Sequence, residues 1–401
     1  MNSKGEICIG TVGAGRATEL HMEGLQRFSG VPVCFKHITA RRFEQVNEAK
    51  ERFGFLNASL DFEDILKDEE IDIVDICTPP YAHDRMIREV LNAGKHVICE
   101  KPLTGYFGKE GEDEEAVGLN TSRKEMYENV IHSMNELRRA VEQSDRKFMY
   151  AENFVYAPAV VKASEIIRKK KSRILYAKGE ESLKGSSSPV AGLWSKTGGG
   201  TFMRTGTHPM CAILWLKRQE AQARGEDIRV KSVFADMSRI TPMLTPYEHR
   251  HIAADPRDVE DCGTAILTFT DGTKAVIIAT DTLLGGSRNY VELYCNDAVI
   301  NCKLTMSDLM STYFLDEDNL EDVYISEMLP GKCGWNNPFL EDEILRGYTD
   351  EMRDFIESVY YDREPKSGFE LAYDTTKIIY AAYLSSELGR AVQFDEAGEL
   401  I

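Results

Sequence analysis

A short glycine-containing segment, Gly13-Ala14-Gly15-Arg16-Ala17-Thr18, directly follows the first apolar run of the chain. Glycines at this spacing let the backbone turn tightly and approach a pyrophosphate, and a following helix adds amide donors and a positive dipole. Thr18 replaces the third glycine of the usual fingerprint, so a simple strand-to-helix turn is the alternative. The position after the first strand favours a dinucleotide-binding loop, with cofactor contacts from Gly13, Ala14, Gly15, Arg16 and Ala17.

The end of the second predicted strand bears on the choice between NAD and NADP. An acidic residue there binds the ribose 2′-hydroxyl of NAD, whereas an arginine attracts the 2′-phosphate of NADP. The segment His37-Ile38-Thr39-Ala40-Arg41-Arg42 contains no acid. Thr39 and Arg41 are therefore predicted cofactor contacts, and the pattern leans towards NADP. Alternatively the arginines only begin a solvated helix, which leaves NAD open.

The whole chain is acidic. Its 401 residues include 48 basic and 66 acidic side chains, which give a formal net charge of −18. A surface of this sign repels nucleic acid and anionic membranes at long range, so neither is an expected partner. The composition, 42% hydrophobic and 28% charged, is typical of a folded globular protein. No apolar run approaches the roughly 20 residues that span a bilayer, and no signal peptide is expected.

The nine cysteines are scattered, without a Cys-x-x-Cys pair, and several lie within apolar runs. This distribution favours reduced cysteines in a reducing compartment over a disulfide framework or a zinc site. The segment His249-Arg250-His251 has no third ligand at a diagnostic spacing and is interpreted as a loop, so no metal is expected. These observations predict a cytoplasmic globular protein.

The elements that must hold the glycine loop alternate across residues 1–152. Strand-like runs are separated by helical segments, and Ser122-x-x-Glu125 forms a capping box for a helix that ends near Gln143. Such alternation predicts βαβ units and a parallel sheet. The predicted strands are Ile7–Val12, Val31–Ile38, Ile71–Cys77, His96–Cys99 and Lys147–Ala151, and the predicted helices include 17–27, 42–53 and 83–92.

A different pattern follows over residues 153–401. Asp271-Gly272 separates two β-rich runs, which is a strong local signal for an antiparallel hairpin. Antiparallel strands after parallel units indicate a second, α+β domain, whose tail from Glu343 to Leu388 is mostly helical. Residues 104–120 are acidic, rich in glycine and without periodicity. We interpret them as a solvated loop, with a lid or an oligomer contact as alternatives.

Three further segments carry a family resemblance: CTPPYAH at 77–83, AGKHVICEKPL at 93–103 and GGGTFMRTGTH at 198–208. Together they resemble the glucose–fructose oxidoreductase / inositol dehydrogenase / MocA (Gfo/Idh/MocA) family of NAD(P)-dependent dehydrogenases. The resemblance implies an N-terminal Rossmann domain and a C-terminal domain built on an open antiparallel β-sheet, an α/β plus α+β architecture. It also implies NAD(P)(H) as cofactor, a sugar, cyclitol or derivative as substrate, and a homo-oligomer.

The resemblance also assigns roles to individual residues. Lys101 is the expected donor to the reacting hydroxyl, and His208 is the expected proton acceptor, whose ordinary pKa of about 6.5 suits that task. The Lys101–Pro102 peptide bond is expected to be cis. Cofactor contacts are expected from Thr78, Pro79, His83, Glu100, Lys101 and Asn153. Substrate contacts are expected from Lys101, Tyr156, Arg204, Thr205 and His208.

The chain departs from the family pattern near these residues. The family commonly has an aspartate four residues before the histidine, where this chain has Arg204. A close arginine would lower the histidine pKa, or it would bind a carboxylate or hydroxyls of the substrate. Val155 replaces the arginine of the family's Asn-x-Arg-x-x-Pro stretch, and Cys211 replaces a second acid. These changes alter substrate recognition more than hydride chemistry.

The leading hypothesis is NAD(P)-dependent oxidation of a secondary hydroxyl on a sugar, cyclitol or glycoside, with C3 of a glucoside as one candidate position. One alternative is a glycoside-cleaving enzyme that oxidises C3 transiently and then eliminates the aglycone. The other is a non-catalytic regulator that binds the cofactor. The joint presence of Lys101 and His208 argues against the regulator, because a sensor needs neither.

Overall fold

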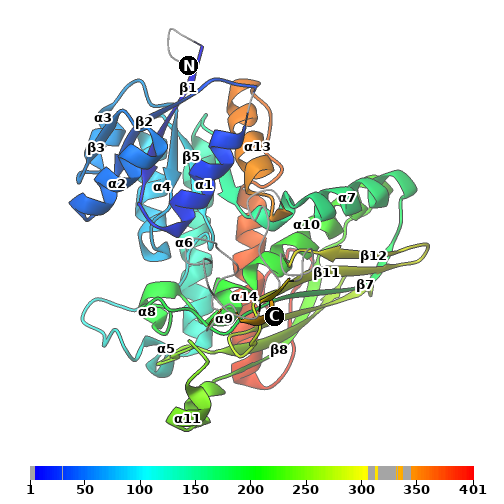
Figure 1. The fold of residues 1–401 in the computed structure, drawn as a ribbon. Coiled ribbons are helices and arrows are strands. Elements are labelled where there is room, and N and C mark those ends of the chain that lie inside the picture. The colour runs from blue at the N-terminus through cyan, green and yellow to red at the C-terminus, as the bar shows by residue number, and fades with distance from the viewer. Residues whose placement is uncertain (1–4, 29, 306–311, 315–330, 332, 337–344) are drawn as a thin grey trace.

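The computed structural model describes residues 5–28, 30–305, 312–314, 331, 333–336 and 345–401. Two large sheets dominate it, one formed by the N-terminal part of the chain and one by the C-terminal part (Figure 1). A small two-stranded sheet joins β13 (Thr312–Phe314) to β14 (Gly334–Asn336).

The first sheet is parallel throughout, with the order β3-β2-β1-β4-β5-β6. The order reverses between β1 and β4, and in such sheets ligands bind at the carboxyl ends of the strands at this point. Both central strands are buried along their whole length, which explains their apolar runs. The strands are β1 (Ile7–Val12), β2 (Val33–Thr39), β3 (Asn57–Ser59), β4 (Ile73–Ile76), β5 (His96–Glu100) and β6 (Phe148–Ala151).

The helices of this part confirm most of the sequence-based predictions. The Ser122 side chain accepts a hydrogen bond from the Glu125 amide and begins α6, which ends at Gln143 as expected. The pattern did not reveal β3 and α3, because both are short and partly polar. The helices are α1 (Arg16–Arg27), α2 (Phe43–Phe53), α3 (Glu63–Lys67), α4 (His83–Asn92), α5 (Val117–Asn120) and α6 (Arg123–Gln143), with a 3₁₀ turn at Pro80–Ala82.

The second sheet has the order β12-β11-β7-β10-β9-β8-β15. The predicted Asp271-Gly272 hairpin is confirmed, because Thr268 of β9 pairs with Lys274 of β10 and Gly272 has a φ of +84°. The sheet is mixed, however, since β7 and β10 run parallel. The strands are β7 (Ile174–Ser182), β8 (Val230–Ser238), β9 (Cys262–Phe269), β10 (Lys274–Thr280), β11 (Arg288–Cys295), β12 (Val299–Lys303) and β15 (Val392–Gln393).

The parallel pair β7–β10, within a sheet whose other described pairs are antiparallel as expected, follows from the connection between β7 and β8. This connection contains α10 and returns the chain in the direction of β7, so that β8 and β10 run with β7 and β9 runs against them. The elements of the connection are α8 (Trp194–Thr197), α9 (Thr201–Arg204) and α10 (Thr207–Arg224). Elsewhere in the second part are α7 (Pro158–Lys170), α11 (Pro246–His249), and 3₁₀ turns at Asn153–Val155 and Thr241–Met243.

The C-terminal helices join the two sheets. The helix α14 (Phe369–Leu388) packs on α6, α10 and β8, and α13 (Tyr348–Tyr360) packs on α1 of the first layer. Figure 1 shows α13 beside α1, although the two helices lie at opposite ends of the sequence. The predicted helical tail is therefore confirmed from 348 onwards, while residues 343 and 344 lie outside the described residues. The boundary at 152/153 stays a prediction, because the later segment also covers the first sheet.

Residues 104–120 form a strap between the two parts of the chain, not the freely solvated loop that we predicted. The buried Asp258 carboxylate accepts hydrogen bonds from the amides of Gly118, at 2.8 Å, and Trp194, at 2.7 Å. The Tyr106 amide donates to the Tyr380 hydroxyl at 2.6 Å. Although the acidic side chains of the segment face solvent, its backbone is fixed to the second domain. Burial raises the pKa of Asp258 above its ordinary value.

Within the described ranges, no helix is both long and apolar enough to cross a membrane. All nine cysteines are free. The cytoplasmic location stays a prediction.

We predict that Gly118→Ala destabilises the protein by about 1–3 kcal/mol, because the new methyl carbon would lie 2.0 Å from the Asp258 carbonyl oxygen. The matched control is Leu119→Ala, which truncates the exposed neighbouring side chain and should change stability by less than about 0.5 kcal/mol. Thermal unfolding of the three proteins measures the difference. Equal unfolding temperatures would mean that the strap does not need this close approach.

Candidate active site

Gly13 joins the carboxyl ends of three strands. Its amide donates to the Thr39 carbonyl at the end of β2, at 2.8 Å, and its φ is +113°. A Cβ atom here would lie 2.4 Å from the Cys77 carbonyl oxygen, just after β4. Only glycine fits both the conformation and the space. The tight turn predicted for this loop is therefore present at the switch point of the sheet.

The start of α1 offers free amide donors next to this turn. Gly15 is the N-cap residue, and no side chain caps the helix. Such a helix end binds phosphate through its first-turn amides and its dipole. Ala14 and Ala17 lie on either side of this helix end and have small side chains, so the loop leaves room for the diphosphate of a nicotinamide nucleotide. Arg16 adds less charge than expected, because its guanidinium pairs with Glu19 at 2.9 Å.

Thr39 and Arg41, the other predicted contacts on the nucleotide side, lie at the end of β2. Thr39 is buried, while Arg41 is exposed just before α2. Thr78 and Pro79 lie after β4, on the opposite side of the switch point. The loop contacts predicted from the resemblance are thus brought to one edge of the sheet.

The side chain of His83, a predicted cofactor contact, is hydrogen-bonded within the protein. The side chain is fully buried, and its two ring nitrogens lie 2.9 Å from the carbonyl oxygens of Thr78 and Pro102. A neutral imidazole donates to one of these oxygens, and an imidazolium donates to both. Either way the ring is occupied within the protein. His83 therefore holds the loops after β4 and β5 together, and its contact with the cofactor stays a prediction.

Lys101 follows β5 and reaches across to the second domain. Its Nζ donates to the carbonyl oxygen of Arg204 at 2.6 Å, and its amide donates to Glu100 Oε2 at 2.8 Å. The Lys101–Pro102 bond is cis, as expected. The side chain is only partly buried. It is therefore held in the space between the first sheet and the segment that leads to His208.

A buried group of charges beneath Lys101 was not found from the sequence. His21 of α1 lies with Nδ1 3.0 Å from Asp75 Oδ1 and with Nε2 3.4 Å from Glu100 Oε1. Burial opposes charge on His21, but Asp75 outweighs it and raises the histidine pKa well above its ordinary value. Burial would raise the pKa of Glu100, yet its hydrogen bond to His21 lowers it. The only available signal was Asp75, an acid within an apolar strand.

Cys77 lies beside this pair, with Sγ 3.5 Å from His21 Nδ1. The side-chain atoms of His21, Asp75 and Cys77 lie within 4.8 Å of one another, a spacing at which a metal ion can bind. Burial raises the pKa of Cys77 to about 12, and the thiol donates to Asp75 Oδ1 at 3.4 Å. The geometry is that of a hydrogen-bonded network beneath the Lys101 strand.

His208 lies in the first turn of α10, buried against Phe154, whose ring stacks on it at 5.0 Å between centroids. Its Nδ1 lies 2.7 Å from Glu152 Oε1, and its Nε2 lies 3.9 Å from Glu181 Oε2 of β7. Burial, and then the charge of Lys101, lower the pKa of His208 to about 3. Burial raises the pKa of Glu152 to about 8. Both shifts favour the uncharged forms of the two groups, with the shared proton on the carboxyl group.

The position of that proton decides what His208 can do. Protonated Glu152 donates to Nδ1, which leaves the ring hydrogen on Nε2. Ionised Glu152 accepts from Nδ1–H, which leaves Nε2 free to accept a proton. Glu152 thus orients the histidine, the task that the family gives to the aspartate missing at position 204. Sequence reasoning missed it, because Glu152 is 56 residues away from His208 along the chain.

Arg204 does not act on His208 as expected. Its guanidinium pairs with Asp281, which lies buried after β10 and also accepts from Thr201 Oγ1 at 3.1 Å. The positive charges that lower the pKa of His208 are those of Lys101 and Arg346. Arg204 therefore contributes its carbonyl to the lysine and its side chain to the rim formed by the second sheet.

Two predicted substrate contacts have hydroxyls that are hydrogen-bonded within the protein, and one predicted cofactor contact is held in place. The Tyr156 hydroxyl is buried, donates to Asp354 at 2.9 Å and accepts from the Ser367 amide, so it belongs to the packing around α13. The Thr205 hydroxyl donates to the Thr201 carbonyl at 2.8 Å within its own turn. Asn153 Nδ2 donates to the Arg346 carbonyl, which fixes the amide beside β6.

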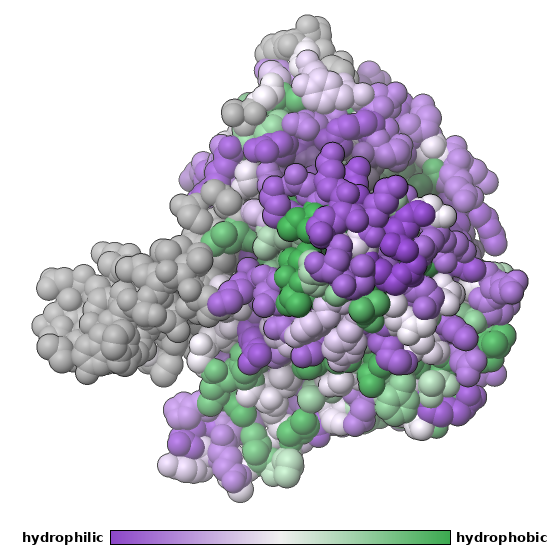
Figure 2. All heavy atoms as spheres, turned by 90° about the vertical axis from the view of Figure 1, so that its right-hand side faces the viewer, coloured by the Kyte–Doolittle hydropathy of each residue, from purple (hydrophilic) through white to green (hydrophobic). Residues whose placement is uncertain are grey.

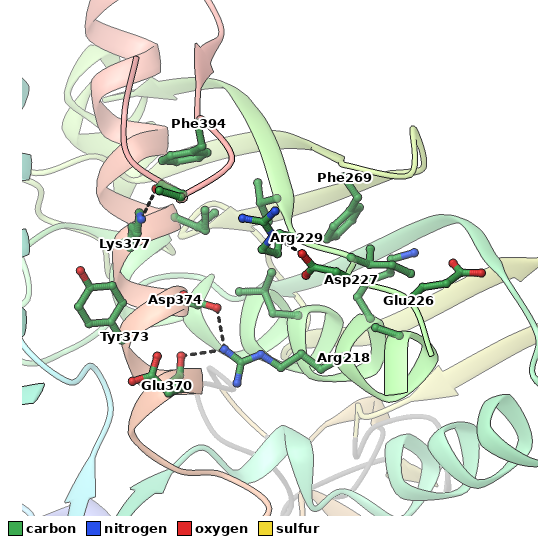
Figure 3. A pocket seen from close by; sticks show the side chains of 18 of the residues that line it. Arg218, Glu226, Asp227, Arg229, Phe269, Glu370, Tyr373, Asp374, Lys377 and Phe394 are labelled. Atoms are coloured by element: carbon green, nitrogen blue, oxygen red, sulfur yellow. Dashed lines mark hydrogen bonds and ion pairs between the residues drawn. The ribbon is translucent and has the colours of Figure 1, made fainter. Parts of the chain in front are cut away.

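A cavity of about 540 Å³ lies away from the residues described above, between α10, α14 and the C-terminal tail (Figure 3). We call it the C-terminal cavity. Its charged groups are largely paired with one another: Arg218 lies 2.6 Å from Asp374, and Arg229 lies 2.9 Å from Asp227. Neither Lys101, His208 nor the glycine loop lines it. Size alone therefore does not mark the active site.

The fold and the site define a nicotinamide-nucleotide-dependent dehydrogenase: a phosphate-binding turn at the switch point, a lysine and a carboxylate-oriented histidine. Comparisons with known families agree. Residues 7–109 match the oxidoreductase family model with an NAD-binding Rossmann fold, and residues 173–301 match the Gfo/Idh/MocA C-terminal domain. The chain belongs to the Gfo/Idh/MocA oxidoreductase family.

Among curated relatives, levoglucosan dehydrogenase from Pseudarthrobacter phenanthrenivorans is 27% identical over 92% of this chain and 93% of its own length. Myo-inositol 2-dehydrogenase from Thermotoga maritima is 31% identical, but over only 24% of this chain and 28% of its own. The first similarity spans both domains, and the second covers about a quarter of each chain.

Solved structures share the fold. An enzyme of gentamicin A biosynthesis, GenD2, in complex with NAD, has a TM-score of 0.77 at 21% identity, with 97% of both chains covered. Levoglucosan dehydrogenase with NADH and levoglucosan has a TM-score of 0.70 at 21% identity, covering 97% of this chain and 99% of that one. These complexes contain NAD or NADH and give no support to the predicted lean towards NADP.

We predict that sugar oxidation by the wild-type protein rises with pH through about 8, because ionisation of Glu152 frees Nε2 of His208. Glu152→Gln cannot ionise, so its profile should lack this rise while the protein still binds the nucleotide. The control, Glu220→Gln, alters a buried carboxylate that pairs with Lys217 at 2.6 Å, and should keep the wild-type profile. The dependence of kcat/KM on pH measures this. A rise retained in Glu152→Gln would exclude Glu152 as its origin.

Proposed function

We propose that the protein oxidises a secondary hydroxyl of a sugar, cyclitol or glycoside and transfers the hydride to NAD. The observation that carries the proposal is the meeting of Lys101 and His208 at one place, although 107 positions separate them in the sequence. The Lys101–Arg204 hydrogen bond and the Glu152–His208 contact hold the two side chains there. The similarity of this protein to levoglucosan dehydrogenase over nearly the whole chain supports a carbohydrate substrate.

The residues divide the work as alcohol oxidation requires. The C–H bond breaks with its electron pair, and the O–H proton must leave as the carbonyl forms. Lys101 donates a hydrogen bond to the reacting oxygen and stabilises its developing negative charge. His208 Nε2 accepts the hydroxyl proton once Glu152 is ionised and holds Nδ1–H. The bound nicotinamide supplies the hydride acceptor, and the amides at the start of α1 hold its diphosphate.

NAD is the cofactor that we propose. The NAD-binding family model and the nucleotides in the related structures favour it. Arg41 is then a solvated residue before α2 and not a ligand of a 2′-phosphate.

Oxidation is favoured over the regulatory alternative because a sensor needs neither the buried Glu152–His208 pair nor Lys101. The glycoside-cleaving alternative uses the same oxidation and adds the loss of an aglycone. Release of an aglycone during turnover distinguishes it from a dehydrogenase.

We expect wild-type protein to reduce NAD in preference to NADP with at least one member of a panel of levoglucosan, myo-inositol, glucose and glucosides. Lys101→Ala should lower kcat by at least about 100-fold while the affinity for NAD, measured by calorimetry, changes little. The control Lys109→Ala removes an exposed lysine of the strap and should leave kcat unchanged. Near-normal turnover by Lys101→Ala would remove this lysine from the mechanism, and preference for NADP would refute the cofactor assignment.

We further propose that two copies of the chain pair through the second sheet. One face of this sheet is covered by α10 and α14, whereas Phe234 and Ile266, directly opposite each other on β8 and β9, are exposed on the other. In Figure 2, hydrophobic residues gather mainly in the lower half of the visible surface, at the height of this sheet in Figure 1. Exposed apolar surface of this kind marks an association site.

Ile266→Glu should therefore lower the molar mass in solution to that of one chain, because it places a charge within the paired faces. The control Met243→Glu changes an exposed apolar residue outside the sheet and should leave the mass unchanged. Size-exclusion chromatography with light scattering measures both. A wild-type protein with the mass of one chain would contradict the proposed pairing.

A further inference from the structure

A small pocket of about 150 Å³ lies beside Arg204, past the carboxyl ends of β7 and β10. It is lined by residues from the loop after β7, the loop before β9, and Asp281 after β10. The Arg204 carbonyl accepts the hydrogen bond from Lys101 Nζ, so the pocket begins at the residue that contacts the proposed catalytic lysine. We call it the rim pocket.

The walls of the rim pocket are rigid. A Cβ atom on Gly185 would lie 2.2 Å from the Ala254 amide nitrogen, and one on Gly192 would lie 2.0 Å from the Asp255 carbonyl oxygen. Hydrogen bonds from Ala253 to the Lys184 carbonyl, at 2.7 Å, and from Arg257 to the Gly192 carbonyl, at 3.0 Å, join the same two loops. The close approach that glycine allows holds the loops together, so the pocket is formed before any ligand enters.

The lining is rich in hydrogen-bonding groups and acidic on balance. Three consecutive serines, 186–188, line one wall. Among the lining carboxylates, Asp281 pairs with Arg204, and Asp255 lies 3.8 Å from Arg257 Nε. The third, Glu260, accepts hydrogen bonds from two backbone amides and the Tyr383 hydroxyl. The buried Nε of Arg204 has no hydrogen-bond partner among the described residues. An anion would be repelled here, whereas a neutral group with several hydroxyls finds both donors and acceptors.

The volume limits the occupant further. Pockets for whole drug-sized ligands measure roughly 300–1,000 Å³, so a pocket of about 150 Å³ takes a substituent and not an entire substrate. Small apolar surfaces from alanine and proline lie among the polar groups, as the mixed faces of a sugar ring require. These lining residues are Ala191, Ala253, Ala254, Pro189 and Pro256.

We propose that the rim pocket binds a second, neutral polyhydroxylated ring joined to the ring that is oxidised. The substrate class is then a disaccharide or another glycosyl-linked sugar, rather than a free monosaccharide or cyclitol. This inference rests on the proposed function, because it extends the same site. It also gives a reason for the departure at position 204: an arginine held by Asp281 presents fixed donors to the second ring, which an aspartate cannot do.

The test compares sugars that differ only in the second ring. NAD reduction is measured with glucose, its α- and β-methyl glucosides, and glucosyl disaccharides of both anomeric configurations and several linkages. We expect at least one disaccharide to exceed both glucose and its methyl glucoside by 10-fold or more in kcat/KM, mainly through a lower KM. Calorimetric titration of the same sugars into the NADH-loaded protein, in which the nucleotide cannot accept a hydride, measures binding without turnover and should give the same order.

Ser187→Trp fills the rim pocket with an indole and should reduce the preference for the disaccharide to below 3-fold. Its matched control is Gln222→Trp, which places the same side chain in the C-terminal cavity and should leave the preference unchanged. Comparing the ratio of the two kcat/KM values within each variant removes any common loss of active protein.

Each outcome decides the inference. Glucose or myo-inositol used as well as every disaccharide would overturn it, while oxidation itself would still support the proposed function. A preference for a negatively charged glucuronide over the neutral disaccharides would overturn the neutral occupant. No NAD reduction with any sugar, together with equal calorimetric affinities, would overturn both this inference and the proposed function.

Discussion

The hydrogen bond from Lys101 Nζ to the Arg204 carbonyl is the contact on which the geometry of this site depends. It joins the residue that directly follows strand β5 to the segment that leads to the helix of His208. A lysine can be held in such a position only if its charge is balanced, since burying an unpaired charge is costly. Glu100 supplies negative charge beside the lysine, and the strap, α13 and α14 keep the two halves of the molecule in register.

Burial sets the chemistry of the groups around this contact. Burial lowers the pKa of His208 and raises the pKa of Glu152, so that the uncharged form of each group is favoured. Glu152 comes from the end of the first sheet, whereas the family's usual acid would come from the turn before the histidine. Moving the acid to the opposite side of the ring leaves position 204 free for an arginine, whose side chain faces the second sheet and Asp281.

Predictions from the sequence were reliable where the cause was local. The glycine loop, the capped α6 helix and the Asp271-Gly272 hairpin follow from neighbouring residues, and the structure has all three. Predictions were incomplete where contacts between distant segments decided the result. Tyr156 lies near the site in sequence, yet its hydroxyl is taken by Asp354, almost two hundred residues away. The strap looked like a solvated loop because its side chains are acidic, while its backbone is bound through Asp258.

The sequence by itself determined the parallel α/β half, the glycine turn at the switch point and the family motifs that contain Lys101 and His208. These depend on backbone conformation and on short-range patterns that residue types impose directly: Gly13, for example, must be glycine because its φ is positive and the Cys77 carbonyl is close. Only the tertiary structure decided that Glu152 orients His208, that His21 supports Glu100, that β7 and β10 are parallel, and that Arg204 faces the rim pocket. The physical reason is that electrostatic pairing and burial depend on distance in space, and residues far apart in the chain acquire these distances only when the two sheets pack together.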